Sequence, residues 1–162
     1  MQQKHPLSQA LERISHLATH DELTGLVNRR HMTELIGVER QRCERAGRPL
    51  VLAILDLDHF KSINDSEGHA AGDQVLQAFA RTVQATVRNT DMLARWGGEE
   101  FVLMLYDSDA ASALGLLERV RAKVQAMELS FDGRSVRVTV SMGVALSRPG
   151  EPLDRLLERA DV

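Results

Sequence analysis

The sequence lacks the residue patterns of several protein classes. Cys43 is the only cysteine among 162 residues, so it offers no disulfide framework or zinc cluster, and a reducing cytoplasm is the natural setting. No apolar run approaches the length of a membrane span, and the N-terminus has no apolar signal-peptide core. The net charge of -3 argues against a non-specific nucleic-acid binder, which is normally basic. A Gly-x-x-x-x-Gly-Lys loop is also absent, which excludes the P-loop nucleotide hydrolases.

The residues that are present indicate one folded domain. A chain of 162 residues, 43% of them hydrophobic and 27% charged, can bury a substantial core and remain soluble. Segments with helical periodicity alternate with apolar segments of strand length, so the fold class is α/β or α+β around one mixed sheet. We expect helices at residues 28–46, 59–67, about 72–88, from about 109 and at 153–160, and strands at residues 50–56, 92–106 (a hairpin), 136–140 and 143–146.

An apolar stripe marks the N-terminal segment. Leu7, Leu11, Ile14 and Ala18 follow one another at spacings of four, three and four residues, as in a coiled-coil seam. The segment is too short to hold a stable dimer by itself. Two interpretations are open: the segment ends a longer signalling helix from an upstream domain, or it is a helix that packs on its own domain.

A Gly-Gly pair followed by two carboxylates is the most informative local pattern. The sequence RWGGEEF occupies residues 95–101 and leads into an apolar run, which predicts a β-hairpin with Gly97 and Gly98 at the turn. Glycine there permits positive φ and lets a ligand approach the backbone. Glu99 and Glu100 then stand at a strand end, where hard cations and phosphates reach them. The alternative is an ordinary hairpin with a solvated acidic start.

A second acidic pattern follows an apolar run. Residues 50–55 are apolar and precede Asp56 and Asp58, which predicts a buried central strand that ends in carboxylates. An aspartate at such a strand end is poorly hydrated unless it is paired or binds a metal, so we expect Asp56 to be a metal ligand. We expect Asp58 mainly to cap the helix that follows. Asp56 and Glu99 would then come from neighbouring strand ends and hold divalent ions.

Four segments of the sequence, taken together and in this order, resemble the GGDEF domain of the diguanylate cyclase family. They are DELTGLVNRR (residues 21–30), DLDHFKSIND (56–65), GHAAGD (68–73) and RWGGEEF (95–101). The resemblance runs from about residue 19 to the C-terminus and is to the variant whose signature is GGEEF. It implies a palm-like nucleotidyl cyclase fold, in which helices surround a central, mostly antiparallel sheet.

The resemblance also implies a domain organisation. Residues 1–19 correspond to an N-terminal signalling or linker helix, and residues 20–162 to the cyclase domain. Family members usually continue through a helix whose lysine and arginine contact the terminal phosphates of GTP. We therefore expect the domain to be truncated at its C-terminal helix, with the metal and guanine sites intact.

The reaction that the resemblance implies joins two GTP molecules into cyclic di-GMP and releases two pyrophosphates. Each 3′-hydroxyl attacks the α-phosphate of the other nucleotide, with help from Mg²⁺ or Mn²⁺, two ions per active site. Asp56, Glu99 and the carbonyl of Leu57 match the metal ligands of the family. Glu100 is a second candidate, as a ligand, as the partner of a cation or simply as an exposed charge. Glu99 is also a candidate base, although a metal-bound route makes a general base unnecessary.

Substrate phosphates have their own candidate residues. The backbone amides around His59 and Phe60 start a helix, where unpaired N–H groups favour anions. Lys61 matches the catalytic lysine that reaches the phosphates in the family. Gly97 and Gly98 let the nucleotide lie close to the hairpin backbone. The side chain of Phe60 is expected in the core.

Guanine recognition is implied at two further positions. Asn64 and Asp73 match the family's guanine-binding residues, and an aspartate accepts hydrogen bonds from the donors on guanine's Watson–Crick edge. Adenine presents a different edge and would leave the aspartate unpaired, so ATP should be a poor substrate. Without the resemblance, Asn64 would be read as a turn residue and Asp73 as a charge at a helix N-terminus.

Product inhibition is implied by an Arg-x-x-Asp motif. Arg88 and Asp91 precede the hairpin turn and match the site where such cyclases bind their own product. Arginine suits both guanine and phosphate, and Arg95 and Arg119 are candidates to complete the site from neighbouring or partner surfaces. The alternative is an ordinary ion pair at a helix end.

The resemblance implies partners as well. They are GTP, cyclic di-GMP, a second copy of the chain for catalysis and an upstream sensory domain. The setting is cytoplasmic, with a parent protein that is either free or membrane-tethered. The alternative functions are a catalytically weak cyclic di-GMP receptor and a GTP-binding regulatory domain. The intact GGEEF motif at residues 97–101 favours catalysis over the receptor, and GTP binding without turnover would support the regulatory domain.

Overall fold

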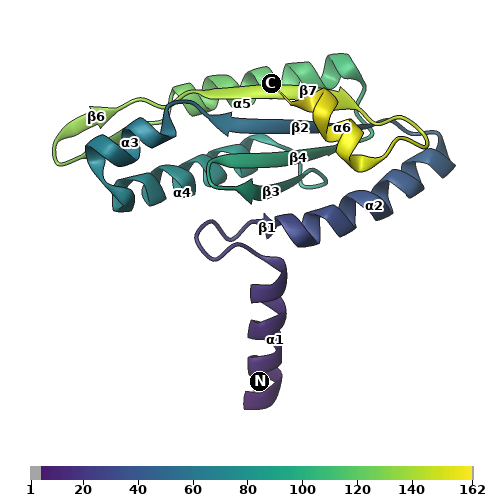
Figure 1. Cartoon of the computed structure of the whole chain (residues 1–162), viewed down its shortest axis with the longest axis horizontal. Coiled ribbons are helices and arrows are strands. Elements are labelled where there is room, and N and C mark those ends of the chain that lie inside the picture. Colours follow the sequence, from purple (N-terminus) through teal and green to yellow (C-terminus); the bar gives the residue numbers. More distant parts are fainter. Residues whose placement is uncertain (1–4, 162) are drawn as a thin grey trace.

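The computed structural model describes residues 5–161, and its centre is a five-stranded sheet in the order β1-β3-β4-β2-β7 (Figure 1). β1 pairs with β3 in parallel, and the other neighbours are antiparallel. The expected mixed sheet is confirmed. In chain order the elements are α1 (Pro6–Thr19), β1 (Val27–Asn28), α2 (Arg29–Ala46), β2 (Leu50–Leu57), α3 (Phe60–Glu67), α4 (His69–Thr86), β3 (Met92–Gly97), β4 (Glu100–Tyr106), α5 (Ala110–Gln125), β5 (Leu129–Phe131), β6 (Arg134–Val136), β7 (Val140–Leu146) and α6 (Leu153–Ala160).

Helices cover both faces of the sheet, which explains why β2 is apolar at nearly every position. Alternate residues of β2 point to opposite faces. Val51 and Leu55 join a cluster with Phe79 of α4, whereas Leu52 joins a second cluster with Met32 of α2. α5 contributes to the first cluster and α6 to the second. Because β2 lies between β4 and β7, the predicted buried central strand is confirmed.

The boundaries of α2 lie within one residue of those expected and are set by its caps. Asn28 accepts a hydrogen bond from the His31 amide at 2.9 Å, and Gly47 ends the same helix, α2, with φ of 65°, in the left-handed region that favours glycine. α4 is an exception, because it begins at His69 and not near Gly72. Gly68, with φ of 92°, separates it from α3 and allows the earlier start.

The expected strand at residues 136–140 is wrong. β6 ends at Val136 and β7 begins at Val140, although the residues between them alternate as in a strand. Leu57, the last residue of β2, pairs with Val140, so residues 137–139 lie beyond the end of the neighbouring strand. The carbonyl of Thr139 instead accepts a hydrogen bond from the Asp58 amide at 3.0 Å.

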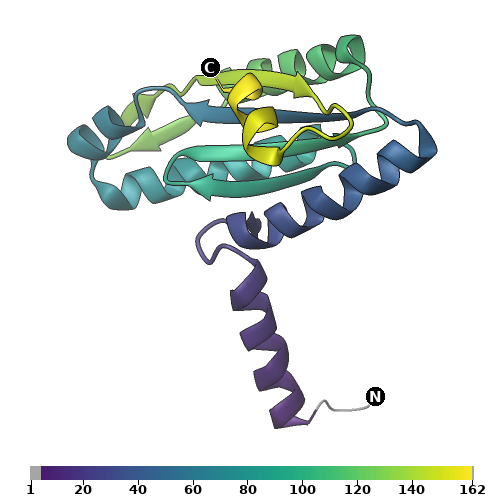
Figure 2. The same ribbon diagram turned by 45° about the vertical axis from the view of Figure 1, so that its right-hand side comes forward.

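α1 points away from the rest of the molecule in both views (Figures 1 and 2). None of its residues is buried, and Leu7, Leu11 and Ile14 are 63%, 59% and 64% exposed. The interpretation that this helix packs on its own domain is therefore wrong, and its apolar stripe faces outward. Among residues 5–161, no helix is both long and apolar enough to cross a membrane.

Candidate functional site

The ends of β2, β3 and β4 form an acidic pocket. It has a volume of about 210 Å³ and is lined by Arg29, Asp56, Trp96, Gly97, Gly98, Glu99 and Glu100. Asp56 of β2 stands opposite Glu100 of β4 in the antiparallel register. The Leu57 amide donates to the Glu99 carbonyl at 3.2 Å. The prediction that Asp56 and Glu99 come from neighbouring strand ends is confirmed.

The carboxylates of this acidic pocket repel one another. Burial, together with the charges of Glu99, Asp58 and Asp161, raises the pKa of Asp56. Burial also raises the pKa of Glu100, along with Asp56, Asp161 and Glu99, and Arg29 is the cation that opposes this shift. A divalent cation would relieve this repulsion and favour the ionised carboxylates.

The chain supplies only part of a metal-ligand shell. Within residues 5–161, no three His, Cys, Asp or Glu side chains converge closely enough to hold a metal ion by themselves. Magnesium commonly takes one or two protein carboxylates and completes its octahedron with water and substrate phosphates. A pocket with Asp56 and Glu99 at adjacent strand ends, beside the backbone of Leu57, fits that mode of binding.

The two glycines of the hairpin matter because they leave the backbone open to a ligand, and not because they adopt a special backbone conformation. Neither Gly97 nor Gly98 is among the residues with positive φ, so the expectation that the turn uses positive φ is wrong. The strands shift register between Arg95 and Gly97. Gly97 is the last residue of β3, and the turn itself lies at Gly98 and Glu99, one residue later than expected. A Cβ on either glycine would meet nothing within 4 Å. The turn therefore presents an open backbone surface to the pocket.

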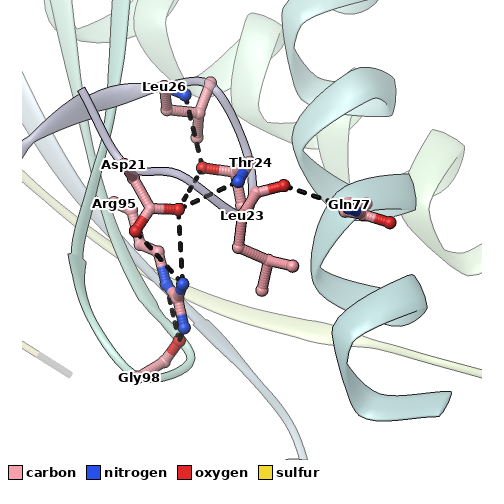
Figure 3. Close-up of polar contacts among 7 residues, drawn as sticks. All are labelled: Asp21, Leu23, Thr24, Leu26, Gln77, Arg95 and Gly98. Carbon is pink, nitrogen blue, oxygen red and sulfur yellow. Dashed lines mark hydrogen bonds and ion pairs between the residues drawn. The ribbon is translucent and has the colours of Figure 1, made fainter. Parts of the chain in front are cut away.

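Arg95 ties this turn to the segment that follows α1 (Figure 3). Its Nε and Nη2 donate to the Gly98 carbonyl at 3.2 and 3.0 Å, and its Nη1 lies 3.2 Å from Oδ1 of Asp21. Asp21 also accepts from the amide and hydroxyl of Thr24 at 2.9 and 2.7 Å. Burial alone would raise the pKa of Asp21, but the Thr24 hydrogen bonds and the Arg95 charge together lower it.

The same segment is anchored to α4. Gln77 Nε2 donates to the Leu23 carbonyl at 3.1 Å (Figure 3). Asp21 and Arg95 belong to two of the four family-like segments, but their contact could not be predicted because they are 74 positions apart. Gln77 lies outside those segments. The hydrogen bonds connect the exit of α1, the hairpin turn and α4.

Asp58 does not cap α3, contrary to expectation. His59 is the N-cap, with φ of 57°, and no side chain caps the helix. Asp58 instead accepts hydrogen bonds from the hydroxyls of Thr139 and Ser141 at 2.7 and 2.6 Å. The left-handed turn at His59 thus leaves the first amides of α3 without a side-chain acceptor. Lys61 is exposed in the first turn of the same helix.

Asn64 and the start of α4 approach each other unusually closely. A Cβ on Gly72 would lie 1.8 Å from Oδ1 of Asn64 and 3.3 Å from Cζ of Phe60, so only glycine fits this position without displacing Asn64. Asp73 is the next residue and is exposed. The two residues expected to bind guanine therefore lie on facing helices at this contact. Phe60 itself is 8% exposed and belongs to the core, as predicted.

Arg88 and Asp91 form a complete internal ion pair. The Asp91 side chain is 0% exposed and accepts from the amide, Nε and Nη2 of Arg88 at 3.0, 3.1 and 2.9 Å. Arg88 also donates to the Tyr106 carbonyl at 2.7 Å and to the Ser108 hydroxyl at 2.8 Å. This is the geometry of the helix-end ion pair that the sequence left as the alternative, although the Arg88 side chain is still 49% exposed.

The other two arginines expected near this motif differ in their contacts. Arg95 is engaged with Asp21 and Gly98 beside the acidic pocket. Arg119 is exposed on α5. The structure therefore holds Arg95 in other contacts and leaves Arg119 on an exposed helix surface.

Comparison with known proteins identifies the family. A family model described as "Diguanylate cyclase, GGDEF domain" matches residues 18–162. The chain belongs to the GGDEF family. Diguanylate cyclase DgcP of Pseudomonas aeruginosa is 42% identical over 144 residues, which are 89% of this chain and 22% of that protein. Diguanylate cyclase DgcM of Escherichia coli is 41% identical over 150 residues, 93% of this chain and 36% of that protein.

Solved structures of GGDEF domains have the same architecture. The coiled coil and GGDEF domain of DgcB from Caulobacter crescentus, in complex with cyclic di-GMP, superimposes with a TM-score of 0.88 at 33% identity, over 95% of this chain and 82% of that one. The expected palm-like fold is thereby confirmed. This GGDEF chain spans only 22% and 36% of the lengths of DgcP and DgcM.

Proposed function

We propose that this GGDEF chain is a diguanylate cyclase that condenses two GTP molecules into cyclic di-GMP and two pyrophosphates. The acidic pocket is the observation that carries the proposal. Asp56, Glu99 and Glu100 line one cavity at the end of the sheet, and their mutual repulsion suits divalent cations. A catalytically inactive GGDEF domain that only binds cyclic di-GMP has no need of these carboxylates.

The metal-binding residues are Asp56, Glu99 and the carbonyl of Leu57, and they hold Mg²⁺ or Mn²⁺, two ions per active site. Such cations neutralise phosphate charge and acidify the attacking 3′-hydroxyl. Glu100 supports the same charge balance from the first position of β4. Glu99 is in addition positioned to accept a proton, because it lies in the turn that faces the pocket.

Substrate binding uses the two ends of α3. The uncapped amides after His59 and the exposed Lys61 hold the phosphates, and Gly97 and Gly98 leave room for the nucleotide over the hairpin. Asn64 and Asp73 bind guanine across the contact between α3 and α4. Gly72 supports this role, because any larger residue would push Asn64 out of place.

Catalysis requires two copies of the chain. Each hydroxyl attacks a nucleotide held by the other copy, so one domain with one GTP cannot close the ring. The outward apolar stripe of α1, with Leu7, Leu11 and Ile14, is suited to pair with the same helix of a second copy. A sensory domain that precedes α1 would control this pairing on the cytoplasmic side, where GTP is available.

Product inhibition involves Arg88 and Asp91. The Arg88 side chain is half exposed, so its guanidinium reaches solvent while Asp91 holds it in place. Cyclic di-GMP bound there must share the donors that now serve Asp91, Tyr106 and Ser108. Arg95 takes part only if it leaves Asp21 and Gly98 or comes from a second copy, whereas Arg119 is available on the exposed surface of α5.

The test is to incubate the protein with GTP and Mg²⁺ at several protein concentrations and to detect cyclic di-GMP by mass spectrometry. We expect product, with a specific rate that rises with protein concentration because the dimer is the active form. ATP should give no comparable product. Absence of cyclic di-GMP at every concentration would contradict the cyclase proposal, and binding of cyclic di-GMP or GTP without turnover would favour a receptor or a regulatory domain.

A further inference from the structure

Arg29 is the basic residue among those that line the acidic pocket. It is the first residue of α2, and its Cζ lies 4.7 Å from the ring centroid of Trp96. Trp96 is 9% exposed and packs against the face of the sheet that α2 covers. A cation–π contact with a buried ring holds a guanidinium in place while leaving its N–H donors available.

These donors have no acceptor among residues 5–161. The structure gives the Arg29 guanidinium its ring contact but no hydrogen bond and no ion pair. Arg88, Arg95 and Arg159 each donate to carboxylates or carbonyls instead. Arginine carries five N–H donors in a fork that matches phosphate. Arg29 is therefore fixed in position and still able to bind an anion.

The local charge also favours an anion at this position. The first turn of α2 contains no acidic residue that could neutralise Arg29. A helix N-terminus already carries partial positive charge, so cations there are unfavourable unless an anion is close. The carboxylate of Glu100 is one such charge, but a phosphate group held by cations on Asp56 and Glu99 would lie in the same cavity.

We propose that Arg29, stacked on Trp96, binds the β- and γ-phosphates of GTP and so holds the pyrophosphate that leaves in the reaction. The inference rests on the proposed cyclase function and assigns one more contact within it. Arg29 approaches from the face covered by α2, whereas Lys61 belongs to α3, which packs with the opposite face through Phe60. The triphosphate is thereby held from both faces at the end of the sheet.

The test compares ligands that differ in their phosphates. Trp96 is the single tryptophan in the sequence, so its fluorescence reports on this pocket without any turnover. Titrations with GMP, GDP and pyrophosphate in Mg²⁺ give the affinities of wild type, Arg29→Ala, Arg29→Lys and Arg30→Ala. Arg30 is the adjacent exposed arginine and does not line the pocket, so Arg30→Ala is the matched control.

We expect Arg29→Ala to weaken the binding of GDP and pyrophosphate by about tenfold to a hundredfold, the range for a lost charge-assisted hydrogen bond. The affinity for GMP should be unchanged. The KM for GTP should rise by a similar factor with a smaller change in kcat. Arg29→Lys should be intermediate, and Arg30→Ala should match wild type. If Arg29→Ala lost equal affinity for GMP and GDP, or lost no affinity for GDP and pyrophosphate, the inference would be overturned. A wild-type protein that makes no cyclic di-GMP would instead count against the cyclase proposal, since these titrations do not depend on turnover.

Discussion

The acidic pocket and the Arg88–Asp91 pair use carboxylates and arginines in opposite ways. In the pocket, Asp56 and Glu100 are crowded by other carboxylates, and both have a raised pKa. At the end of α4, Asp91 is fully buried and receives three hydrogen bonds from Arg88. The first region is short of positive charge, whereas the second is internally satisfied.

This difference separates a pocket whose charges are unbalanced without a cation from an ion pair that is complete within the protein. A bound cation stabilises carboxylates that are crowded in a cavity. Without it, the protein retains their mutual repulsion. A buried and fully paired carboxylate gains nothing comparable from an added ligand. Any ligand at Arg88 has to compete with bonds that the protein already makes.

The largest expected effect concerns the pocket. Glu99→Gln keeps the size of the side chain but removes a charge that we propose holds the metal ions, and metal stabilisation of the transition state is worth several kcal/mol. We therefore expect the rate of cyclic di-GMP formation to fall at least about a thousandfold, with an unchanged circular dichroism spectrum. Full activity in this variant would remove Glu99 from the metal site.

Removal of the Arg88–Asp91 pair should lower the stability of the fold. Arg88→Ala leaves the buried Asp91 carboxylate with a single backbone donor from residue 88, so we expect the free energy of unfolding to fall by about 1–3 kcal/mol. Urea denaturation measures this change. The same variant should lose product inhibition, which a titration of the initial rate with cyclic di-GMP would detect. An unchanged inhibition curve would exclude Arg88 from the inhibitory site, and unchanged stability would show that the pair is dispensable for the fold.

The pocket should also couple stability to pH and to Mg²⁺. Because the pKa values of Asp56 and Glu100 are raised in the folded state, that state binds their protons more tightly than the unfolded state does. Without metal, their contribution to stability therefore decreases as the pH rises through the interval between the ordinary and the raised pKa values. Mg²⁺ should raise the melting temperature by a few degrees near neutral pH.

Acid should abolish this stabilisation, because protons then displace the cation as the pH falls through the raised pKa values. Thermal melts with and without Mg²⁺ between pH about 4 and 8 would test the coupling. Asp21, whose pKa is lowered, has the opposite dependence, and its stabilisation is lost as the pH falls through that lowered value. If the increase in melting temperature on adding Mg²⁺ did not depend on pH, the proposal that Asp56 and its neighbouring carboxylates bind the cation would be contradicted.

The smallest effect is expected at an exposed ion pair of similar geometry. Arg121 donates three hydrogen bonds to Glu118 at 2.6–3.1 Å, but both residues are on the exposed face of α5. Water and salt screen such a pair, so we expect no measurable change in the melting temperature of Arg121→Ala. If Arg121→Ala and Arg88→Ala lowered the melting temperature equally, burial of Asp91 would not be what distinguishes the Arg88–Asp91 pair from the Arg121–Glu118 pair.

Much of the fold follows from local pattern. The apolar run of β2 and the hairpin at the two glycines predict their elements because each depends on near neighbours in the chain, although the turn itself lies at Gly98 and Glu99. The strand expected at residues 136–140 fails because a strand needs a partner, and β2 ends opposite Val140. The cap expected at Asp58 fails because Thr139 and Ser141, more than 80 positions away, bind its carboxylate instead.

The site divides in the same way. The sequence by itself determined the acidic motifs, their order and hence the family, since these depend only on residue type and spacing. Only the tertiary structure decided which residues meet: Arg29 in the same pocket as the carboxylates, Arg95 at Asp21 and Asn64 against Gly72. Pairing of charges and close contact between helices depend on distances in space, and segments far apart in the chain acquire those distances only when the sheet assembles and the helices pack on it.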